Sequence, residues 1–551
     1  MKEKLRVGLL VDEFNVSAWA YRMLERIKEE GFAEIILIIK KETQKPAETK
    51  LDKFRKAFPY LLYLQYRKFD KYLFKTKHNA FAKKDLRQLT DCKILPVTTI
   101  QTKHTDRLTD EDLNKIRNEQ PDVLLRLGFK ILKGEILNVA RFGIWSFHHG
   151  DNRLNRGMPA GLWEVMNEWD ETGVTLQILT EDLDAGKVLA RSYSSTDDFS
   201  VERNLNNFYW KSLSLVPRKL KELNQLGEQR FFELVEKENR HPEFYSNQLF
   251  TVPKNGNLLM AVGKKIYKKL KQKISDLFFF NQWHLLYHLN KKEEMSRSFY
   301  RFKKLLPPKD RFWADPHVIK RGDSHYIFME ELPYKTGKGH ISVIEVDAKG
   351  KVGPSEIVLD KAYHLSYPFL FEDNDALYMI PETKANKTIE LYRCTSFPYQ
   401  WELVKIIKQD LEAVDATIHK QDGKYWMFVN IKENPGASTM DELFLFYTNS
   451  LLEDNWIPHP KNPIVSDVKS ARPAGRLFYH KNQLYRPSQN SGKTYGYGMK
   501  ICRVDILSET DYQEVVVDSI FPNWDKNLLA THSLSHDSNL TVIDGLYRVK
   551  K

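Results

Sequence analysis

Cysteine is scarce in this sequence, with only Cys92, Cys394 and Cys502 among 551 residues. Three dispersed cysteines are too few for a disulfide framework or a cysteine-based zinc site, and an odd number is typical of a reducing compartment. Long apolar runs are missing as well, since no stretch approaches the roughly 18 residues of a membrane-spanning helix and the N-terminus lacks the apolar core of a signal peptide. We therefore expect a cytoplasmic protein.

The composition also differs from that of a disordered chain, because 42% of the residues are hydrophobic and 12% are aromatic. A chain of 551 residues is too long for one hydrophobic core and predicts two to four domains. The formal net charge of +12 favours anionic partners, but basicity alone identifies none of them.

The first 150 residues alternate between strand and helix patterns. Short runs rich in β-branched residues predict strands at 6–11, 34–40, 122–127 and 143–147. Helical periodicity covers 17–30, which ends at Gly31, and 132–140. This order is typical of a parallel sheet covered by helices. The turn after the first strand lacks a Gly-rich dinucleotide fingerprint, so no nucleotide cofactor is expected there.

A basic helical segment follows in the middle of the chain. Helical periodicity over 204–226 and a loop-like stretch at 242–253 lead to 258–277, where lysines alternate with apolar residues. Such a helix could lie on an anionic membrane surface or against another chain, or it could be a solvated linker helix packed on its own domain. The lysines proposed for peripheral membrane contact are Lys264, Lys265, Lys268 and Lys269.

The last 270 or so residues contain a repeat. The similar strand-like segments YIFMEE, LYMIPE, YWMFVN, LYRPSQ and LTVIDG begin at 326, 377, 425, 484 and 540. Five β-rich units with a period near 50 residues predict a five-bladed propeller. Polar residues of its inner strands should surround one axial pocket, although they could instead cap strand ends and bridge neighbouring blades. The candidate ligand-binding residues are Asp315, His364, Glu382, Asp415, Arg472, Gln489 and His532.

Two segments of this region, WADP and VDATIHKQDGKYWMF, resemble the five-bladed glycosidase propellers of arabinanases and xylosidases. The likeness is closer still to the propeller domain of inositolphosphorylceramide glucosamine transferases. The resemblance implies that Asp315 is a general base and that Asp415 tunes the acid. Where the glycosidases have their acidic Glu, this chain has Arg472, which cannot donate a proton but can bind a phosphate or a carboxylate. Glu382 could replace the acid, but we expect glycan or sugar-phosphate binding, or transfer, rather than simple hydrolysis.

The segment 121–189 resembles the catalytic core of formyltransferases that depend on 10-formyltetrahydrofolate, which include glycinamide ribonucleotide, methionyl-tRNA and sugar-amine enzymes. The family pattern is Gly, Asn-x-His, Arg-Gly, Thr-Gly-Val-Thr and Asp-x-Gly. It reads here as Gly143, Ser146-Phe147-His148, Arg156-Gly157, Thr172-Gly173-Val174-Thr175 and Asp184-Ala185-Gly186. The resemblance implies that His148 and Asp184 relay a proton or stabilise an oxyanion. It also implies that 10-formyltetrahydrofolate is the cofactor and that Arg156, Gly157 and Thr175 bind substrate.

Two departures from the formyltransferase pattern bear on activity. Ser146 replaces the usual asparagine as the third catalytic residue, and its hydroxyl can donate one hydrogen bond but reaches less far than an amide. A lost oxyanion donor costs on the order of 3 kcal/mol, so either a neighbour such as His149 supplies the donor or the site has changed its function. Asp151-Asn152-Arg153 replaces an apolar loop sequence. Adjacent histidines point to opposite sides of a strand, so His148 and His149 are not expected to share a metal ion.

The predicted architecture is a Rossmann-like α/β formyltransferase domain at 1–205, a helical linker at 206–279 and an all-β five-bladed propeller at 280–551. The leading hypothesis is N-formyl transfer to an amino sugar or nucleotide sugar in surface-polysaccharide biosynthesis, with the propeller binding the glycan. The alternatives are glycosidase or glycosyltransferase-like activity in the propeller beside a vestigial formyltransferase domain, and a noncatalytic glycan-binding protein. Nucleic acid is an unlikely partner, because no recognised motif accompanies the positive charge.

Overall fold

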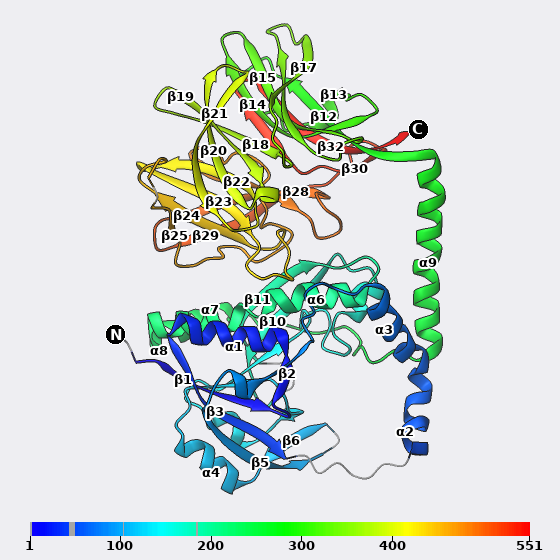
Figure 1. The fold of residues 1–551 in the computed structure, drawn as a ribbon, viewed down its shortest axis with the longest axis vertical. Coiled ribbons are helices and arrows are strands. Elements are labelled where there is room, and N and C mark those ends of the chain that lie inside the picture. The colour runs from blue at the N-terminus through cyan, green and yellow to red at the C-terminus, as the bar shows by residue number, and fades with distance from the viewer. Residues whose placement is uncertain (1–2, 43–49, 103, 183–185, 454) are drawn as a thin grey trace. The chain divides into compact units, whose positions relative to one another are not determined.

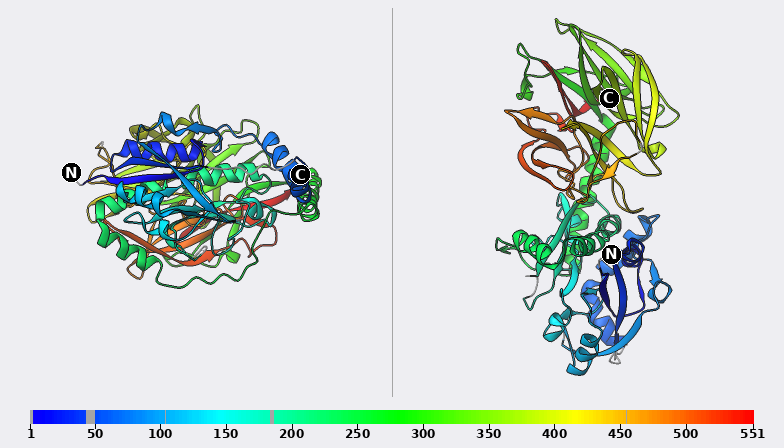
Figure 2. Two further views of the ribbon diagram at one scale, coloured as in Figure 1. Left: turned by 90° about the horizontal axis from the view of Figure 1, so that it is seen from below. Right: turned by 90° about the vertical axis from the view of Figure 1, so that its left-hand side faces the viewer.

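The computed structural model describes all residues except 1–2, 43–49, 103, 183–185 and 454. The chain divides into two compact units, Met1–Ile266 with Glu433–Ala437, and Tyr267–Lys432 with Ser438–Lys551. None of the helices in the described part of the chain is long and apolar enough to cross a membrane. Figures 1 and 2 show the ribbon in three views, and each unit is described by itself.

The first unit is built on a nine-stranded sheet of order β11-β10-β9-β7-β1-β3-β5-β6-β8. The strands β1, β3, β5, β7 and β9 are parallel, whereas β10 at one edge runs antiparallel to both of its neighbours, β9 and β11. The bounds are β1 Leu5–Val11, β3 Ala33–Glu42, β5 Lys93–Gln101, β6 Thr105–Leu108, β7 Val123–Arg126, β8 Ile131–Leu132, β9 Ile144–His148, β10 Glu171–Ile178 and β11 Lys187–Ser195. A small separate ribbon pairs β2 Asn15–Ser17 with β4 Lys83–Asp85.

Helices cover both faces of this sheet, because alternate residues of its strands are apolar on each side. Val7 and Leu9 of β1 belong to one core with α1 and α7, whereas Leu10 belongs to a second core with α4. Figure 1 shows α1 and α7 on one side of the sheet and α4 on the other. The helices of this unit are α1 Ala18–Glu30, α2 Lys50–Ala57, α3 Leu61–Leu73, α4 Asp110–Asn118, α5 Leu162–Met166, α6 Val201–Ser212, α7 Leu215–Leu226 and α8 Glu228–Glu238.

The structure differs from the sequence prediction at two places. The helix predicted at 132–140 is only a 3-10 turn, η3 Glu135–Asn138, which starts after Gly134 at φ 82°. The division at 205 falls inside α6, and α6 to α8 pack into the core of the first unit through residues such as Phe208, Leu220 and Phe231. These helices are therefore part of the first unit, and the helix that connects the two units is α9 Asn255–Phe278.

The described residues of the second unit form five antiparallel sheets, which confirms the predicted five-bladed propeller. Four blades follow one another along the chain as β14 Arg311–Arg321 to β17 Val352–Leu359, β18 Ser366–Asp373 to β21 Gln400–Gln409, β22 Ala413–Gln421 to β25 Ile457–Pro458, and β26 Phe478–His480 to β29 Tyr512–Ile520. The fifth blade combines the two ends of the unit, since β12 Phe279–Leu289 pairs with β32 Leu540–Lys550 over its whole length. Its other strands are β13 Lys303–Leu305, β30 Leu528–Ala530 and β31 Leu534–Asp537.

Candidate functional site

The first strands of three blades carry the same backbone irregularity at the same position. The register of these strands shifts between Ala314 and His317, Ser366 and Phe369, and Val414 and Thr417. The bulged residues Asp315, Tyr367 and Asp415 have φ angles of 51°, 41° and 54°. A non-glycine residue in this left-handed region costs about 1–3 kcal/mol and is often found where a side chain must be aimed at a site. The three bulges therefore point to a shared functional position on the blades.

The second strands of the blades contribute another set of polar residues beside these bulges. Glu330 lies opposite Ala314 and Glu382 lies opposite Ser366, each next to a bulged residue. The corresponding residues of β27 and β32 are Gln489 and Asp544. We call the following residues the axial cluster: Asp315, Glu330, Glu382, Asp415, Arg472, Gln489, Tyr495, His532 and Asp544.

One half of the axial cluster is a chain of ion pairs through His532. The Nδ1 atom of His532 lies 2.7 Å from Asp544 Oδ2, and its Nε2 atom lies 3.2 Å from Asp315 Oδ1. Ser533 donates a hydrogen bond of 2.9 Å to the same oxygen of Asp315. Each of these groups is at least nine-tenths buried. Two flanking carboxylates raise the pKa of His532 to about 10 although burial alone would lower it, so the ring is a cation at neutral pH.

The other half is centred on Arg472. Its Nε and Nη2 atoms lie 2.5 and 3.0 Å from the two oxygens of Asp415, and Nη2 also lies 3.2 Å from Glu382. Gln489 donates a further hydrogen bond of 2.8 Å to Asp415. The fork of Arg472 is therefore engaged by carboxylates of the protein itself.

Tyr495 connects the two halves. Its hydroxyl lies 3.3 Å from His532 Nε2, and its ring lies 5.2 Å from the guanidinium carbon of Arg472. With 42% of its surface exposed, Tyr495 also borders the solvent. The axial cluster is thus one connected network with an exposed residue at its edge.

The carboxyl groups of the axial cluster differ strongly in acidity. Burial opposes the charge of Asp315, but His532 overcomes this and lowers the pKa of Asp315 to about 2. Burial raises the pKa of Glu382 to about 8 against the opposing charge of Arg472. Burial, together with Asp315 and Glu382, also raises the pKa of Glu330 well above its usual value. At neutral pH, the ionised Asp315 therefore belongs to the same network as Glu382, which is largely protonated.

His364 lies at the edge of this network. Its Nδ1 atom accepts a hydrogen bond of 2.9 Å from the backbone N–H of Gly339, and its Nε2 atom lies 3.3 Å from Glu330. Burial lowers the pKa of His364, and because Nδ1 is an acceptor, the proton of the neutral tautomer lies on Nε2, the atom that faces Glu330. About a third of the side chain, 34%, is exposed.

The structure brings Asp315, Glu382, Asp415, Arg472 and His532 together, as the inner-strand pattern predicted. The sequence argument missed Glu330, Tyr367, Tyr495 and Asp544. A signal was present for two of them, because Glu330 and Asp544 stand at the fifth position of the aligned repeat segments YIFMEE and LTVIDG.

The predicted formyltransferase residues lie at the end of β9 and on β10. Ser146 and His148 are two residues apart and share one face of the sheet, opposite Gln177 and Thr175 of the antiparallel strand β10. The Nε2 atom of His148 lies 2.7 Å from the carbonyl oxygen of Asn155. A carbonyl can only accept, so Nε2 carries the proton and Nδ1 is left as an acceptor. Asp184 lies outside the described residues.

The loop after β9 closes over this face with polar contacts. Asp151 is buried and accepts two hydrogen bonds from the Arg153 side chain, at 3.0 and 2.8 Å. Burial would raise the pKa of Asp151, but the contacts with Arg153 lower it below its usual value. This ion pair takes the place of the apolar contacts that the family sequence would make.

Three residues expected to bind substrate make contacts that hold the fold of this loop. Arg156 donates to Asn152 O at 2.8 Å, with its guanidinium 4.6 Å from the ring centre of Tyr245. Gly157 has no room for a side chain, because a Cβ atom would lie 1.9 Å from Phe250 O. The fully buried Thr175 donates to Gly150 O at 3.3 Å. The structure therefore gives Arg156, Gly157 and Thr175 positioning roles.

The asparagine that Ser146 replaces has a candidate substitute on the next strand. Ser146 is 3% exposed, and its hydroxyl approaches the carbonyl of Phe147 at 3.4 Å. Gln177, directly opposite on β10, is 5% exposed, and its Oε1 atom has no hydrogen-bond partner among the described residues. The amide of Gln177 could have been identified from the sequence only by predicting the register in which β9 pairs with β10.

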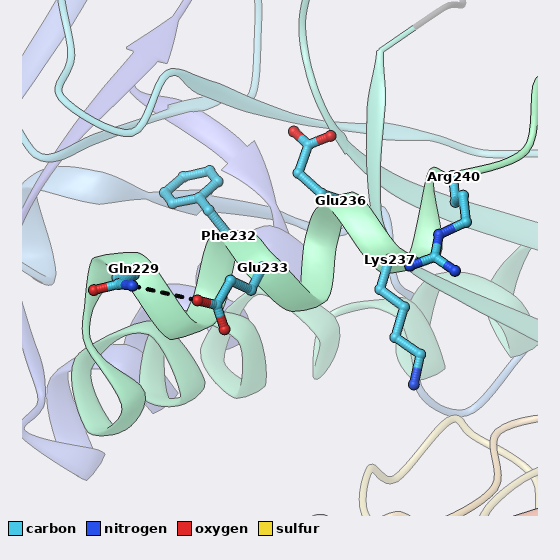
Figure 3. A pocket seen from close by; sticks show the side chains of 6 residues that line it. All are labelled: Gln229, Phe232, Glu233, Glu236, Lys237 and Arg240. Carbon is cyan, nitrogen blue, oxygen red and sulfur yellow. Dashed lines mark hydrogen bonds between the residues drawn. The ribbon is translucent and has the colours of Figure 1, made fainter.

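Two other features are weaker candidates. Asp315, His532 and Asp544 have ligand-type atoms within 4.8 Å of one another, but these atoms already form the ion pairs described above. A shallow hollow along α8, shown in Figure 3, is lined by exposed charged side chains such as Glu233 and Lys237. His149 follows directly after β9 and lies on the side of the sheet opposite to His148, where its ring centre is 3.8 Å from that of Tyr209.

The two units match different known proteins. Residues 306–540, which apart from Glu433–Ala437 lie in the second unit, match the family model "Glucosamine inositolphosphorylceramide transferase 1, N-terminal". The Glucosamine inositolphosphorylceramide transferase 1 of Arabidopsis thaliana is 38% identical over 210 residues, which cover 37% of this chain and 27% of the relative. A methionyl-tRNA formyltransferase of Clostridioides difficile (strain 630) is 28% identical over 120 residues, which cover 22% of this chain and 38% of the relative. Among solved structures, an α-L-arabinofuranosidase of Podospora anserina has a TM-score of 0.33 and 9% identity, covering 48% of this chain and 97% of that chain.

The chain resembles both formyltransferases and the propeller part of the plant transferases, as the sequence motifs indicated. It spans about a quarter of the length of the plant relatives and just over a third of that of the bacterial relative.

Proposed function

We propose that this protein transfers a formyl group from 10-formyltetrahydrofolate to the amine of an amino sugar or nucleotide sugar, and that the propeller binds the amino glycan. The observation that carries this proposal is the state of His148, whose Nε2 proton is donated to Asn155 O while Nδ1 is left to accept a proton. The likeness to methionyl-tRNA formyltransferases supports the same chemistry. The name of the plant relatives supports an amino sugar, because it refers to glucosamine.

The residues around His148 suit this cosubstrate. When bound, 10-formyltetrahydrofolate would supply the formyl carbon and its oxygen. His148 Nδ1 would accept the proton that the attacking amine must lose. The Gln177 amide, with its unpartnered buried Oε1, would turn its N–H toward the oxygen on which negative charge develops.

The propeller supplies a site of the right charge for the sugar. The axial cluster holds five carboxyl groups, but Arg472 and His532 are its only cations. Burial raises the pKa of two of the carboxyl groups, that of Glu382 to about 8 and that of Glu330 well above its usual value. A protonated amine can replace the protons of these groups and form charge-assisted hydrogen bonds, so the site favours a cationic sugar over a neutral one.

The test is a formyl-transfer assay on the full chain with 10-formyltetrahydrofolate and a panel of amino-sugar nucleotides and glucosamine oligomers. We expect a formylated sugar to be detected by mass spectrometry, and His148→Asn to reduce its formation by about 100-fold or more. His480→Asn, at an exposed position of β26, is the matched control and should retain activity. Absence of product across the panel, or equal activity of His148→Asn, would overturn the proposal.

A second candidate function is favoured by the acidities in the axial cluster. Asp315 is ionised with a pKa of about 2, whereas Glu382 has a pKa of about 8. Cleavage or transfer at a glycosidic bond requires one ionised carboxylate and one protonated carboxylic acid. Under this alternative, Asp315→Asn and Glu382→Gln would each abolish release or transfer of a sugar from a glycan. Formyl transfer to a small amino sugar would persist in both variants.

A further inference from the structure

Helix α9 exposes a continuous apolar stripe. Leu259, Ile266, Leu270, Ile274 and Leu277 are spaced by seven, four, four and three residues, so they lie on one side of the helix. Each of them is exposed, from 48% for Ile266 to 69% for Leu277. Burying such side chains is favourable, and a row of five exposed ones indicates a surface that is covered in use.

A different side of α9 packs on the first unit. Leu258 and Lys265 are 2% and 5% exposed, and Lys265 Nζ donates to Asp198 O at 2.7 Å. This corrects the sequence expectation for Lys265, which cannot contact a membrane from a buried position. The exposed stripe is therefore not the face by which the helix is held in its own domain.

Lysines border the stripe on both sides. Lys264 and Lys271 are seven residues apart along one border, and Lys273 lies on the other border. All three are exposed, and the helix contains a single acidic residue, Asp276. The stripe thus combines apolar side chains with positive charge, as in helices that lie in a membrane interface.

A second exposed apolar set adjoins the first turn of α9. Asn255 donates from Nδ2 to Phe58 O and accepts from the backbone N–H of Leu62, both at 3.0 Å, so the start of α9 is fixed to the start of α3. The neighbouring exposed apolar residues are Phe54, Phe58, Leu62, Phe69, Tyr72 and Leu73. Exposed basic residues lie among them, namely Arg55, Lys68, Lys71 and Lys75. Aromatic and basic residues together are typical of segments that meet lipid headgroups.

We propose that the α9 stripe forms a docking surface for a membrane that contains anionic lipids. A second copy of the chain fits this surface less well, because pairing two stripes would bring Lys264, Lys271 and Lys273 of both copies together with few acidic partners. Anionic headgroups instead compensate these charges while the apolar side chains enter the acyl boundary. The helix would lie on the membrane rather than cross it.

The experiment is co-sedimentation of the full chain with vesicles of phosphatidylserine and phosphatidylcholine, compared with vesicles of phosphatidylcholine alone. We expect binding to the anionic vesicles, weakened by salt. The triple variant Lys264→Gln, Lys271→Gln, Lys273→Gln should bind roughly 100-fold more weakly, because each lysine near an anionic surface contributes about a factor of five. The triple variant Ile266→Ser, Leu270→Ser, Ile274→Ser should also lose binding if the stripe inserts.

A matched control removes the same charge from exposed positions of the propeller, with Lys335→Gln, Lys349→Gln and Lys526→Gln. This control should bind vesicles like the unchanged chain. Equal loss in both lysine variants, or no binding to anionic vesicles, would overturn the proposal. A stripe variant could instead change the molar mass of the protein in light scattering without changing vesicle binding. The stripe would then be an interface with a second copy of the chain, and the membrane proposal would be overturned.

Discussion

Binding of a protonated amino sugar to the propeller should release a proton from Glu382. Its pKa is about 8, raised chiefly by burial, so at about pH 7 roughly 0.9 of the Glu382 side chains are protonated. A cation at hydrogen-bond distance lowers the pKa of a carboxyl group by about 1–3 units. A decrease of about 2 would leave roughly 0.1 of the side chains protonated, so binding would release about 0.8 protons from this residue.

Calorimetry in two buffers of different ionisation enthalpy measures this release. Glucosamine oligomers are the ligand, N-acetylglucosamine oligomers are the neutral comparison, and Glu382→Gln keeps the side-chain shape without the titration. We expect the unchanged chain to release about 0.8 more protons than Glu382→Gln at about pH 7, and Glu356→Gln, an exposed control, to behave like the unchanged chain. The reasoning is refuted if Glu382→Gln releases as many protons, or if the neutral oligomers bind as tightly as the amino form.

Three further predictions concern single residues. Gln177→Leu should reduce formyl transfer by about 100-fold with little change in KM, because it removes a hydrogen-bond donor that stabilises the negative charge developing on the formyl oxygen. Gln177→Asn should retain part of the activity. Equal loss of activity in both variants would contradict this role of Gln177. Arg472→Met should lower the free energy of unfolding in urea by about 3–5 kcal/mol, since it leaves the buried Asp415 without its cationic partner; a change below about 1 kcal/mol would contradict this role of Arg472. The pKa of His532 is raised to about 10, so its contribution to stability is complete below about pH 6.5 and is lost as the pH rises toward about 10. Thermal unfolding should therefore show a loss of stability over this range that is absent in His532→Asn.

Repetition explains why the propeller could be predicted. Five segments of similar pattern each supply a second strand, and the structure places them in β15, β19, β23, β27 and β32. Pairing of β12 with β32 was not predictable by the same reasoning, because their partnership joins residues that are more than 250 positions apart and have no shared pattern. Local sequence patterns therefore predict the individual blades, whereas the pairing that closes the ring joins strands from the two ends of the propeller.

The α/β unit was predicted where the apolar pattern was strong. The structure confirms the strands near 6–11 and 143–147, and Gly31 ends the first helix in a left-handed conformation at φ 73°. The segment 132–140 has helical spacing, but Gly134 at φ 82° and the short connection to β9 leave room for only a 3-10 turn. Tertiary context overrides local periodicity in such short segments.

Site prediction was limited by contacts between segments that lie far apart in the sequence. Asp315, Asp415 and His532 could be proposed because their residue types are unusual in an inner strand, but the sequence shows neither the bulges that aim the aspartates nor the pairing of Arg472 with Asp415. Gln177 depends on the register of β9 with β10, which places it opposite Ser146. When a residue on one strand takes over the role of a residue on the neighbouring strand, as proposed for Gln177, neither segment alone contains a motif that shows it.

The buried charges of the propeller are costly to its fold, and this bears on what they do. Blade packing requires only apolar contacts, as the cores formed by Phe369, Ile418 and Met427 show. Ion pairs in such surroundings are frequently replaced by apolar residues without loss of stability. Glu330 and Glu382 are costly as well, because burial disfavours their charged forms and raises the pKa of both carboxyl groups. The fold does not require this network, which is held at strained backbone positions and bordered by the exposed Tyr495. These are properties expected of a ligand site. Because acidic side chains outnumber basic ones in the network, it favours a ligand that carries positive charge.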